Sequence, residues 1–533
     1  MSALQEKSLQ STQSQEDKHG SHVDEQQGKP HNDHDVTLIP RPSDNPRDPL
    51  NWSRQKKYTT VAVLSLSTFA GFTTSLAGQL EVGPLSKLYG KPTTTLAYQN
   101  SAALAGMIIG SIFFFWLSRL IGRQSVMLWS LFGCLLSSLF ASLLTDKHDF
   151  DLLVISRGLA GFFGTVVGVL GPRCLIDMFF LHQRGRAFTI FHFFFDLGNT
   201  AGPSISALVT HPTGDWRWAF RWCIILDGVA FLVYFALMDD TTWDRTPGAV
   251  NLERPGGWLA SRIATFVPGT QITRRVSFRG FIKQALAPFK IALTPVSMVL
   301  SFFTLFSFGF YVAMNATTPT YLQKAIKEGG YGFTPFENAL FQFFHWVGIG
   351  LALPYGQIVS DRIPLYFASR YGHGSWKPEY RLHALWLPAL ICNPIGIAIF
   401  GYGLAHHMSW GFLGFAQILV TYGSLCITPI TVNYLSECFT RNIEETAIVL
   451  NAFRIGFGLS IAFYLKPWVE KVGLVWTYGT MAFIQLFAFC FVMILLWKGH
   501  EIRRIDPFGM ICTEEGQQIV DEKGTHDELA ESA

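Results

Sequence analysis

The sequence predicts an all-α integral membrane protein with twelve transmembrane helices in two six-helix bundles. Three observations predict this class. Only 15% of the 533 residues are charged and 49% are apolar, whereas about a quarter of the residues in soluble domains are charged. The apolar residues gather in segments of about 20, the length that a helix needs to cross about 30 Å of hydrocarbon. A polar stretch of about 50 residues divides these segments into two sets of six.

Twelve apolar segments have the length of a membrane-spanning helix. A run such as Ile108 to Leu117 is apolar on every face, whereas a barrel strand alternates between apolar and polar residues. The expected spans are therefore helices. In chain order they are 58–80, 98–118, 124–145, 151–173, 186–209, 218–238, 292–315, 336–359, 382–404, 409–432, 444–466 and 473–497.

The polar segments divide the chain into five expected parts. Basic residues flank the first and last spans, so the positive-inside rule predicts that both tails are cytoplasmic. The first 57 residues hold no short apolar run with a cleavage site, and the first span is therefore expected to act as the insertion signal. The parts are a disordered tail at 1–57, an N-terminal bundle at 58–238, a cytoplasmic central loop at 239–291, a C-terminal bundle at 292–497 and a tail at 498–533.

Composition and motifs exclude several classes of function. A chain this apolar is not a soluble enzyme, and a net charge of +3 with dispersed basic residues offers no face for nucleic acid. The eight cysteines lack metal-ligand spacing and no P-loop is present, so we expect no metal, no cofactor and no direct use of ATP. No compact catalytic set indicates a membrane-embedded enzyme. Two sets of six spans are typical of a secondary transporter with a site between its halves; a sensor without flux is the alternative.

Ionisable residues inside the first six spans are the first candidates for a site. A charge at mid-bilayer costs about 2.5 to 3.5 kcal/mol, so it must face a cavity or a partner. His192 and Asp196 are four residues apart and share a helix face. Because imidazole exchanges protons near neutral pH, they predict proton coupling or substrate contact, with a structural pair as the alternative. Asp227 needs a partner or water and is a candidate for contact with substrate or protons. Arg157 can make the protonation of a nearby carboxylate depend on conformation.

The second six spans supply fewer candidates. Asn451 and Arg454 lie three residues apart in the span 444–466, and Glu437 follows the span 409–432 at its inner end. We expect them to contact substrate or protons, with a solvated Glu437 as the alternative. His345 is expected to be a packing histidine. Asn315 begins a glycosylation sequon at the expected outer end of the span 292–315.

Four stretches resemble motifs of one transporter family. They are DNPRDPLNWS at 44–53, LSRLIGRQSV at 117–126, GNTAGP at 198–203, and the loop from Ser360 to Leu382 with its SDR and PEYRL segments. On these motifs the chain resembles the major facilitator superfamily from about Asp44 to Trp497, and more closely its fungal twelve-span drug:proton antiporter branch. Arg157 with Gly161, and Asn451 with Arg454, are similar to further motifs of that branch.

The resemblance implies roles for the motif residues. Gly198, Gly202 and Pro203 correspond to the antiporter element of the fifth span, and Arg157 to a residue that takes part in proton coupling. The loop residues Arg119, Gly122, Arg123, Asp361 and Arg362 correspond to gating loops that hold the two halves together. Arg119 stands where the family carries an acid, and Gln124 where it carries a second basic residue, which puts the expected lock of the first half in doubt.

The resemblance also implies a function. We expect a proton-coupled efflux transporter of a small organic molecule, a drug, toxin or secondary metabolite, that acts as a monomer with protons, substrate and the bilayer as its partners. The departure at Arg119 leaves proton-coupled import of an organic cation or other nutrient as the alternative. The expected location is the plasma membrane, with a vacuolar or other internal membrane as the alternative.

Overall fold

The apolar segments form helices in the structure, a computed structural model that describes residues 43, 45–243, 245, 251, 255–268, 282, 284–371, 377–439 and 442–511. Within these ranges all regular structure is helical. The expected disordered tails lie mostly outside the described residues, as does much of the expected central loop. The described helices fall within one unit, Pro40–Gln517.

The first set of elements runs from the start of the described chain to the central loop. Its members are η2 (Pro49–Asn51), α2 (Arg54–Leu76), α3 (Val82–Tyr89), α4 (Thr93–Leu96), α5 (Tyr98–Ile121), α6 (Arg123–Leu143), α7 (Phe150–Gly164), α8 (Val166–Met178), α9 (Leu181–Thr213), α10 (Trp218–Leu237) and α11 (Trp258–Phe266).

The second set follows the central loop. Its members are α13 (Ala287–Ala292), α14 (Pro295–Gln323), η3 (Ile326–Glu328), α15 (Pro335–Phe341), α16 (Phe343–Pro354), η4 (Tyr355–Val359), α17 (Ser360–Tyr371), η5 (Pro378–Leu385), η6 (Trp386–Cys392), α18 (Asn393–Ala405), α19 (Trp410–Cys438), α20 (Ile443–Val472) and α21 (Leu474–Arg504).

Nine helices of the described chain are long and apolar enough to cross a membrane, and a tenth is counted if Ile443–Ser460 and Phe463–Val472, bent by 54°, form one span. The two remaining expected spans, 186–209 and 336–359, correspond to α9 and to the series α15, α16 and η4. α9 carries charged and polar residues, and the second series is interrupted at Gln342. The number twelve therefore stays a prediction, while the membrane-embedded helical fold is confirmed.

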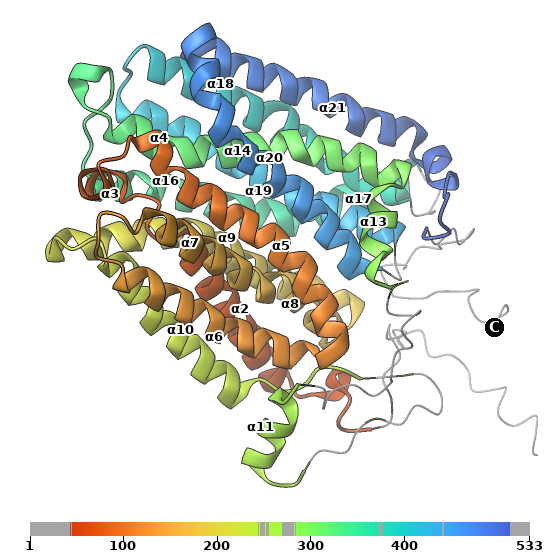
Figure 1. Cartoon of the computed structure of the whole chain (residues 1–533). Coiled ribbons are helices and arrows are strands. Elements are labelled where there is room, and N and C mark those ends of the chain that lie inside the picture. The colour runs from red at the N-terminus through yellow and green to blue at the C-terminus, as the bar shows by residue number, and fades with distance from the viewer. Residues whose placement is uncertain are drawn as a thin grey trace, which may run out of the picture. The chain divides into compact units, whose positions relative to one another are not determined.

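The helices pack as two neighbouring groups (Figure 1). In the first, α2 packs on α9, α7 and α10, while α5 packs on α7 and α6 on α10. In the second, α14 packs on α20 and α21, and α18 packs on α19 and α21. The groups meet where α5 contacts α20 and where α9 contacts α15 and α16. Each group also has an apolar core of its own.

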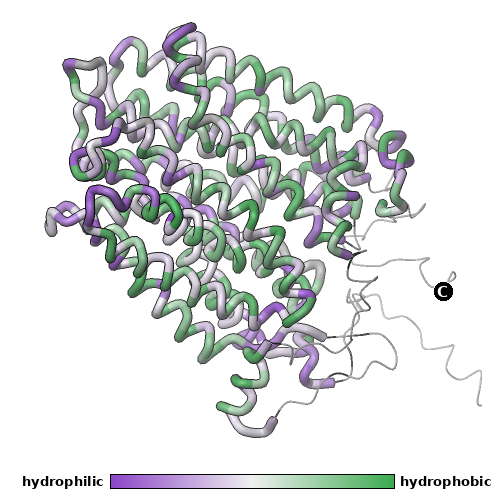
Figure 2. The backbone as a smooth tube through the Cα atoms, viewed as in Figure 1, coloured by the Kyte–Doolittle hydropathy of each residue, from purple (hydrophilic) through white to green (hydrophobic). Residues whose placement is uncertain are grey.

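The outer surface of the helices matches a lipid environment. Apolar residues extend along the helices, and hydrophilic residues gather towards helix ends (Figure 2). Large apolar side chains lie exposed on this surface, including Leu143 at 67%, Leu232 at 64% and Phe483 at 66% exposure. Lipid tails cover such side chains at no hydrophobic cost, and the helices satisfy their own backbone hydrogen bonds. The chain is a multi-pass membrane protein.

The segment before α2 is tied to the chain that follows α10. Asp48 caps η2, accepts hydrogen bonds from the backbone N–H of Ser43 and of Leu50, each at 3.0 Å, and pairs with Arg245 at 2.8 Å. Burial alone raises the pKa of Asp48, but Arg245 and the backbone donors together hold it below the ordinary value. The Lys57 ammonium donates to the Leu50 carbonyl at 2.9 Å. This is the structural role of the DNPRDPLNWS motif.

Candidate functional site

A cavity lies between the two groups of helices. Its volume, measured as the space open to the centre of a water molecule, is about 70 Å³. That volume holds a few waters, whereas clefts for small molecules span about 300 to 1,000 Å³. The cavity is therefore contracted in this structure. Its lining comes from α2 and the turn that follows it, and from α5, α9, α14, α19 and α20. The lining residues are Phe72, Leu76, Gln79, Asn100, Leu104, Met107, Asp196, Asn199, Phe308, Tyr311, Val312, Asn315, Ala316, Leu425, Arg454 and Ile455.

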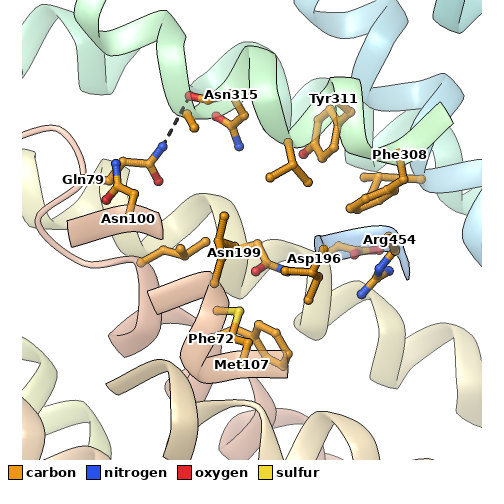
Figure 3. Close-up of a pocket in the computed structure, with 16 residues that line it drawn as sticks. Phe72, Gln79, Asn100, Met107, Asp196, Asn199, Phe308, Tyr311, Asn315 and Arg454 are labelled. Carbon is orange, nitrogen blue, oxygen red and sulfur yellow. Dashed lines mark hydrogen bonds between the residues drawn. The ribbon is translucent and has the colours of Figure 1, made fainter. Parts of the chain in front are cut away.

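Asp196 and Arg454 are the charged residues of this lining, and they come from opposite groups of helices (Figure 3). Asp196 lies on α9 and Arg454 on α20. The two charges interact electrostatically, yet among the described residues no carboxylate lies within 4.0 Å of the Arg454 guanidinium. The sequence prediction that these two ionisable residues face a cavity agrees with their placement.

The Arg454 side chain is held by uncharged neighbours. Nη2 donates to Asn451 Oδ1 at 2.8 Å and Nη1 to Thr428 Oγ1 at 3.4 Å. The guanidinium lies 4.5 Å from the centre of the Phe308 ring and 5.4 Å from that of Phe195, distances at which a ring face attracts a cation. Asn451 thus positions Arg454 and is not itself part of the cavity lining.

His192 is not bonded to Asp196. The two share a face of α9, as their spacing predicts, but no hydrogen bond or ion pair joins them in the described part of the chain. The His192 ring instead contacts Phe188, Phe191 and Phe195, with ring centres 5.7 to 6.1 Å apart. The predicted proton-exchanging pair is absent in this state.

Arg157 and Asp227 form a second polar group, inside the first set of helices. Arg157 Nη2 donates to the carbonyls of Thr74 at 2.7 Å and Ser75 at 2.6 Å. Thr74 Oγ1 donates to Asp227 Oδ2 at 2.8 Å. Arg157 is 2% exposed and Asp227 is fully buried, and neither lines the cavity. Thr74 therefore connects α7 and α10 through α2, and the sequence prediction of a substrate contact at Asp227 has no support from this geometry.

Glu437 lies away from the cavity as well. Its Oε1 forms an ion pair with Arg381 Nε at 2.5 Å. Glu379, which lies on η5 with Arg381, pairs with Arg503 at 2.9 Å.

His345 is fully buried and bonds to Thr421 Oγ1 at 2.7 Å and to Gln417. The expectation that His345 is a packing histidine with satisfied polar atoms agrees with these contacts.

Gly198 and Gly202 allow α9 to lie directly against α2. A Cβ on Gly202 would collide with the Thr73 carbonyl, and one on Gly198 would lie 2.9 Å from the Phe69 carbonyl oxygen. Thr73 Oγ1 donates to the Gly198 carbonyl at 3.4 Å across this contact. Pro203 lies inside α9, which continues through it to Thr213. The glycines thus set the position of the helix that carries Asp196.

We expect Gly202→Ala to lower the melting temperature of the detergent-solubilised protein and to reduce transport several-fold, because the added methyl group pushes α9 from α2. Gly228→Ala is the matched control. A Cβ at Gly228 meets only Leu135 Cδ1, at 3.7 Å, and alanine favours a helix by up to about 1 kcal/mol over glycine. Equal melting temperatures for the two variants would contradict this expectation.

Ion pairs close the bundle at one end, which we call the Arg119 end and define by residues 119–123. Arg119 Nη2 lies 2.8 Å from Glu444 Oε2 and 3.4 Å from Glu445 Oε1, both in the first turn of α20. Arg173 lies 3.7 Å from Glu444. Arg119 stands where the family carries an acid, and its ion-pair partners on α20 are acids. An ion pair therefore joins the two groups of helices at this end, with the positive charge on the first group and the negative charges on the second.

Arg123 and Gly122 stabilise the same end within the first group. Arg123 Nη2 pairs with Asp177 at 2.6 Å. Gly122, between α5 and α6, has φ of 94°, a backbone conformation that favours glycine. Gln124, where a basic residue was expected, accepts a hydrogen bond from the Tyr234 hydroxyl at 2.6 Å. In the corresponding second loop, Arg362 is exposed on α17, and the side chain of Asp361 lies outside the described residues.

Uncharged contacts join the two groups at the opposite end, which we call the Gln79 end and define by residues 79–81 together with Asn315 and Gln323. Gln79 Nε2 donates to the Asn315 carbonyl at 3.3 Å, and Gln323 Nε2 to the Leu80 carbonyl at 2.8 Å. The rings of His211 and Phe336 stack with centres 4.4 Å apart. Contacts therefore join the two groups of helices at both ends of the bundle.

The glycan expected on Asn315 stays a prediction, which the position of this residue does not favour. The expected seventh span ends at Asn315, but α14 continues to Gln323, eight residues or about 12 Å further. Asn315 is part of the cavity lining and its carbonyl binds Gln79 (Figure 3). A glycan needs an exposed asparagine, and this one faces the interior.

Glu81 is a buried acid between α2 and α3, at the Gln79 end. It is 1% exposed, and Thr210 Oγ1 donates to its Oε1 at 2.6 Å. Burial raises the pKa of Glu81 to about 7, although the hydrogen bond from Thr210 partly opposes the rise. Glu81 is not among the candidates from the sequence, because an acid directly after a span is ordinarily solvated.

Glu81 is expected to make the stability of the protein fall as pH rises. Its pKa is raised from 4.5 in the unfolded chain to about 7, so its stabilising effect is complete below pH 4.5 and is lost as pH rises through about 7. The loss is at most about 3 kcal/mol. Melting temperatures at pH 5 and pH 8.5 should differ more for the natural protein than for Glu81→Gln, and Thr210→Val should move the transition to higher pH. An equal pH effect in Glu81→Gln would show that another group is responsible.

Other cavity residues were missed because they carry no charge. Asn199, Asn100, Gln79 and Tyr311 line the cavity. Single amides and phenols in apolar runs are common in helix packing, so Asn100, Gln79 and Tyr311 gave no signal. Asn199 did have one, since it lies between the two glycines of the GNTAGP motif, three residues after Asp196.

Long apolar helices in two groups, with a cavity between them that Asp196 and Arg454 line, are the architecture of a secondary transporter. A profile of the Major Facilitator Superfamily matches residues 58–375, and the chain belongs to that family. Membership supports a transporter rather than a catalytic role.

Individual proteins similar to this chain fit the same assignment. The efflux pump radE of Floropilus chiversii is 26% identical over 468 residues, which cover 86% of this chain and 83% of that protein. The MFS-type transporter MFS19 of Alternaria alternata is 25% identical over 478 residues, covering 87% and 91%. A crystal structure of a D-xylose-proton symporter matches with a TM-score of 0.55 and 16% identity, over 84% of this chain and 98% of that one, and shows the fold alone.

Proposed function

We propose that this protein is a proton-coupled transporter that exports a small organic molecule. The observation that carries the proposal is the position of Asp196. It is the carboxylate of the central cavity, it lies on α9 directly before the Gly198 to Pro203 segment, and it faces Arg454 on the other group of helices. A carboxylate at this depth binds or releases its proton as its exposure to water changes.

The direction of transport is supported by two observations. The GNTAGP segment resembles the antiporter element of the fungal drug:proton branch, and one of the similar proteins is named an efflux pump. We propose a monomer in the plasma membrane with both tails cytoplasmic, bundles at 58–238 and 292–497 and the central loop at 239–291. This orientation places the Arg119 end at the cytoplasmic surface.

Transport into membrane vesicles of both orientations tests the function. A metabolite panel should accumulate in inside-out vesicles when their interior is acidified, and a protonophore should abolish the accumulation. Accumulation that survives the protonophore would overturn proton coupling. Accumulation only in right-side-out vesicles, with the outside acidified, would replace export by import. Protease accessibility of tags on the two tails tests the orientation.

A further inference from the structure

We propose that the cavity selects amphipathic molecules without net charge, neutral or zwitterionic, that present a hydrogen-bond donor to Asp196 and an acceptor to Arg454. The proposal rests on the proposed function in one respect: it takes the cavity of Asp196 and Arg454 as the substrate site. It adds the chemical class of the substrate, which neither the family nor the named relatives supply.

The charge of the cavity is the first reason. Asp196 and Arg454 have opposite signs, and the rest of the described lining is formally uncharged. When both are ionised the cavity has no net charge. A molecule of net charge zero preserves this balance, whereas an anion or a cation leaves one charge uncompensated. At membrane depth an uncompensated charge costs about 2.5 to 3.5 kcal/mol.

The hydrogen bonding of Arg454 is the second reason. Its side chain is 8% exposed, and the buried Nε has no hydrogen-bond partner in the described residues. Asn451 and Thr428 occupy the two Nη atoms as neutral acceptors, and Asp196 forms no ion pair with the guanidinium. A buried donor without an acceptor costs about 1 to 3 kcal/mol. The guanidinium is thus prepared for an acceptor from outside the chain, such as a carbonyl or carboxylate.

The arrangement of the lining gives the third reason. Figure 3 shows Gln79, Asn100 and Asn315 together on one side of the cavity and Asp196 and Arg454 on the other. Amides both donate and accept hydrogen bonds without charge. Apolar side chains form much of the remaining wall, among them Phe72 and Met107, and Phe308 lies beside Arg454. A molecule with polar groups at both ends and an apolar or aromatic middle fits this pattern.

Binding of one scaffold in four charge states tests the proposal. The probes are L-phenylalanine, a zwitterion; 2-phenylethylamine, a cation; N-acetyl-L-phenylalanine, an anion; and N-acetyl-L-phenylalanine methyl ester, which is neutral. Calorimetry on the purified full chain at pH 7 gives each dissociation constant. The zwitterion and the neutral ester should bind at least about tenfold more tightly than the singly charged probes.

Two variants should change this order in opposite directions. Arg454→Gln leaves Asp196 alone and should make the cation the best ligand, while Asp196→Asn leaves Arg454 alone and should make the anion the best ligand. Glu470→Gln, a carboxylate-to-amide change at a side chain that is 63% exposed, is the matched control and should keep the original order. The proposal is overturned if the natural protein binds the singly charged cation or anion most tightly, or if it binds none of the four probes. It is also overturned if the two variants show the same order of affinities.

Failure of this inference and failure of the proposed function are distinguishable. Calorimetry in detergent involves no proton gradient. If the protein prefers the probes of net charge zero but transports without proton coupling, only the proposed function is overturned. A coupled transporter that prefers a singly charged probe would overturn only the substrate class.

Discussion

Asp196→Asn is expected to reduce gradient-driven transport by at least about 100-fold while exchange of substrate between the two sides of the membrane persists. The amide has nearly the same volume as the carboxylate but does not gain or lose a proton near neutral pH, so the proton gradient no longer drives the conformational cycle. Arg454 and the apolar walls remain to bind substrate. Proteoliposomes with an imposed pH gradient measure the first activity, and counterflow without a gradient measures the second.

The control for Asp196→Asn is Glu470→Gln, which should retain both activities. His192→Gln should shift the pH dependence and reduce transport less severely, because His192 contacts phenylalanine rings and is not bonded to Asp196. If Asp196→Asn retains normal transport with an unchanged pH profile, Asp196 is structural. The coupling group must then be another buried acid, such as Asp227 or Glu81.

Arg119→Glu is expected to open the Arg119 end. The substitution replaces the cation between Glu444 and Glu445 with a third acid, so that attraction at 2.8 and 3.4 Å becomes repulsion, which Arg173 opposes only from 3.7 Å. Amide hydrogen exchange in residues 117–124 and 443–448 should increase at least about tenfold, and transport should fall at least about fivefold, because one conformation is favoured over the others.

Charge exchange provides the sharper test of this contact. Arg119→Glu combined with Glu445→Arg restores an opposite pair across the same helices and should return hydrogen exchange towards the original level. Lys466→Glu, the same kind of reversal at a 60% exposed side chain of α20, should change neither measurement. If amide hydrogen exchange in Arg119→Glu stays at the level of the natural protein, or if it does not fall again in the double variant, the ion pairs do not hold this end together.

The fold was predictable from the sequence because the bilayer imposes a length and a hydropathy on every spanning helix. Two expected spans do not pass as single long apolar helices in the described chain: the series α15, α16 and η4 is divided into helices of 7, 12 and 5 residues, and α9 carries charged and polar residues. α9 fails for a functional reason, since it carries Asp196 and Asn199 into the cavity. Helix ends were less predictable: α14 continues past Asn315 because its last turns bind the other group of helices through Gln323.

The ionisable candidates for the site were predictable from the sequence, but the uncharged cavity residues and the grouping of the charges were not. Charge in an apolar run identified Asp196, Arg454, Arg157 and Asp227. Which of them face the cavity depends on contacts between residues far apart in sequence, such as the hydrogen bond from Thr74 to Asp227. Spacing on one helix paired His192 with Asp196, yet the aromatic neighbours of His192 on that helix occupy its ring instead.

The exchanged charges at Arg119 were also beyond sequence reasoning. The motif showed that the family's acid is missing, which suggested a weakened lock. The compensating acids, Glu444 and Glu445, are more than 320 residues away in sequence, and only the packing of α5 against α20 brings them into contact.

The two ends of the bundle differ in how they respond to electrolyte. At the Arg119 end the closing contacts are ion pairs, and Arg119 is 37% exposed. Counterions reach it, and the screening length at physiological ionic strength is about 8 Å. At the Gln79 end the contacts are amide hydrogen bonds and a ring stack, and the Glu81 carboxylate is 1% exposed, so counterions have little to screen. Salt added to one face of a vesicle should therefore loosen the protein, while the same salt on the other face leaves it unchanged. The ionic strength of one compartment, and not that of the other, therefore shifts the conformational equilibrium of the protein.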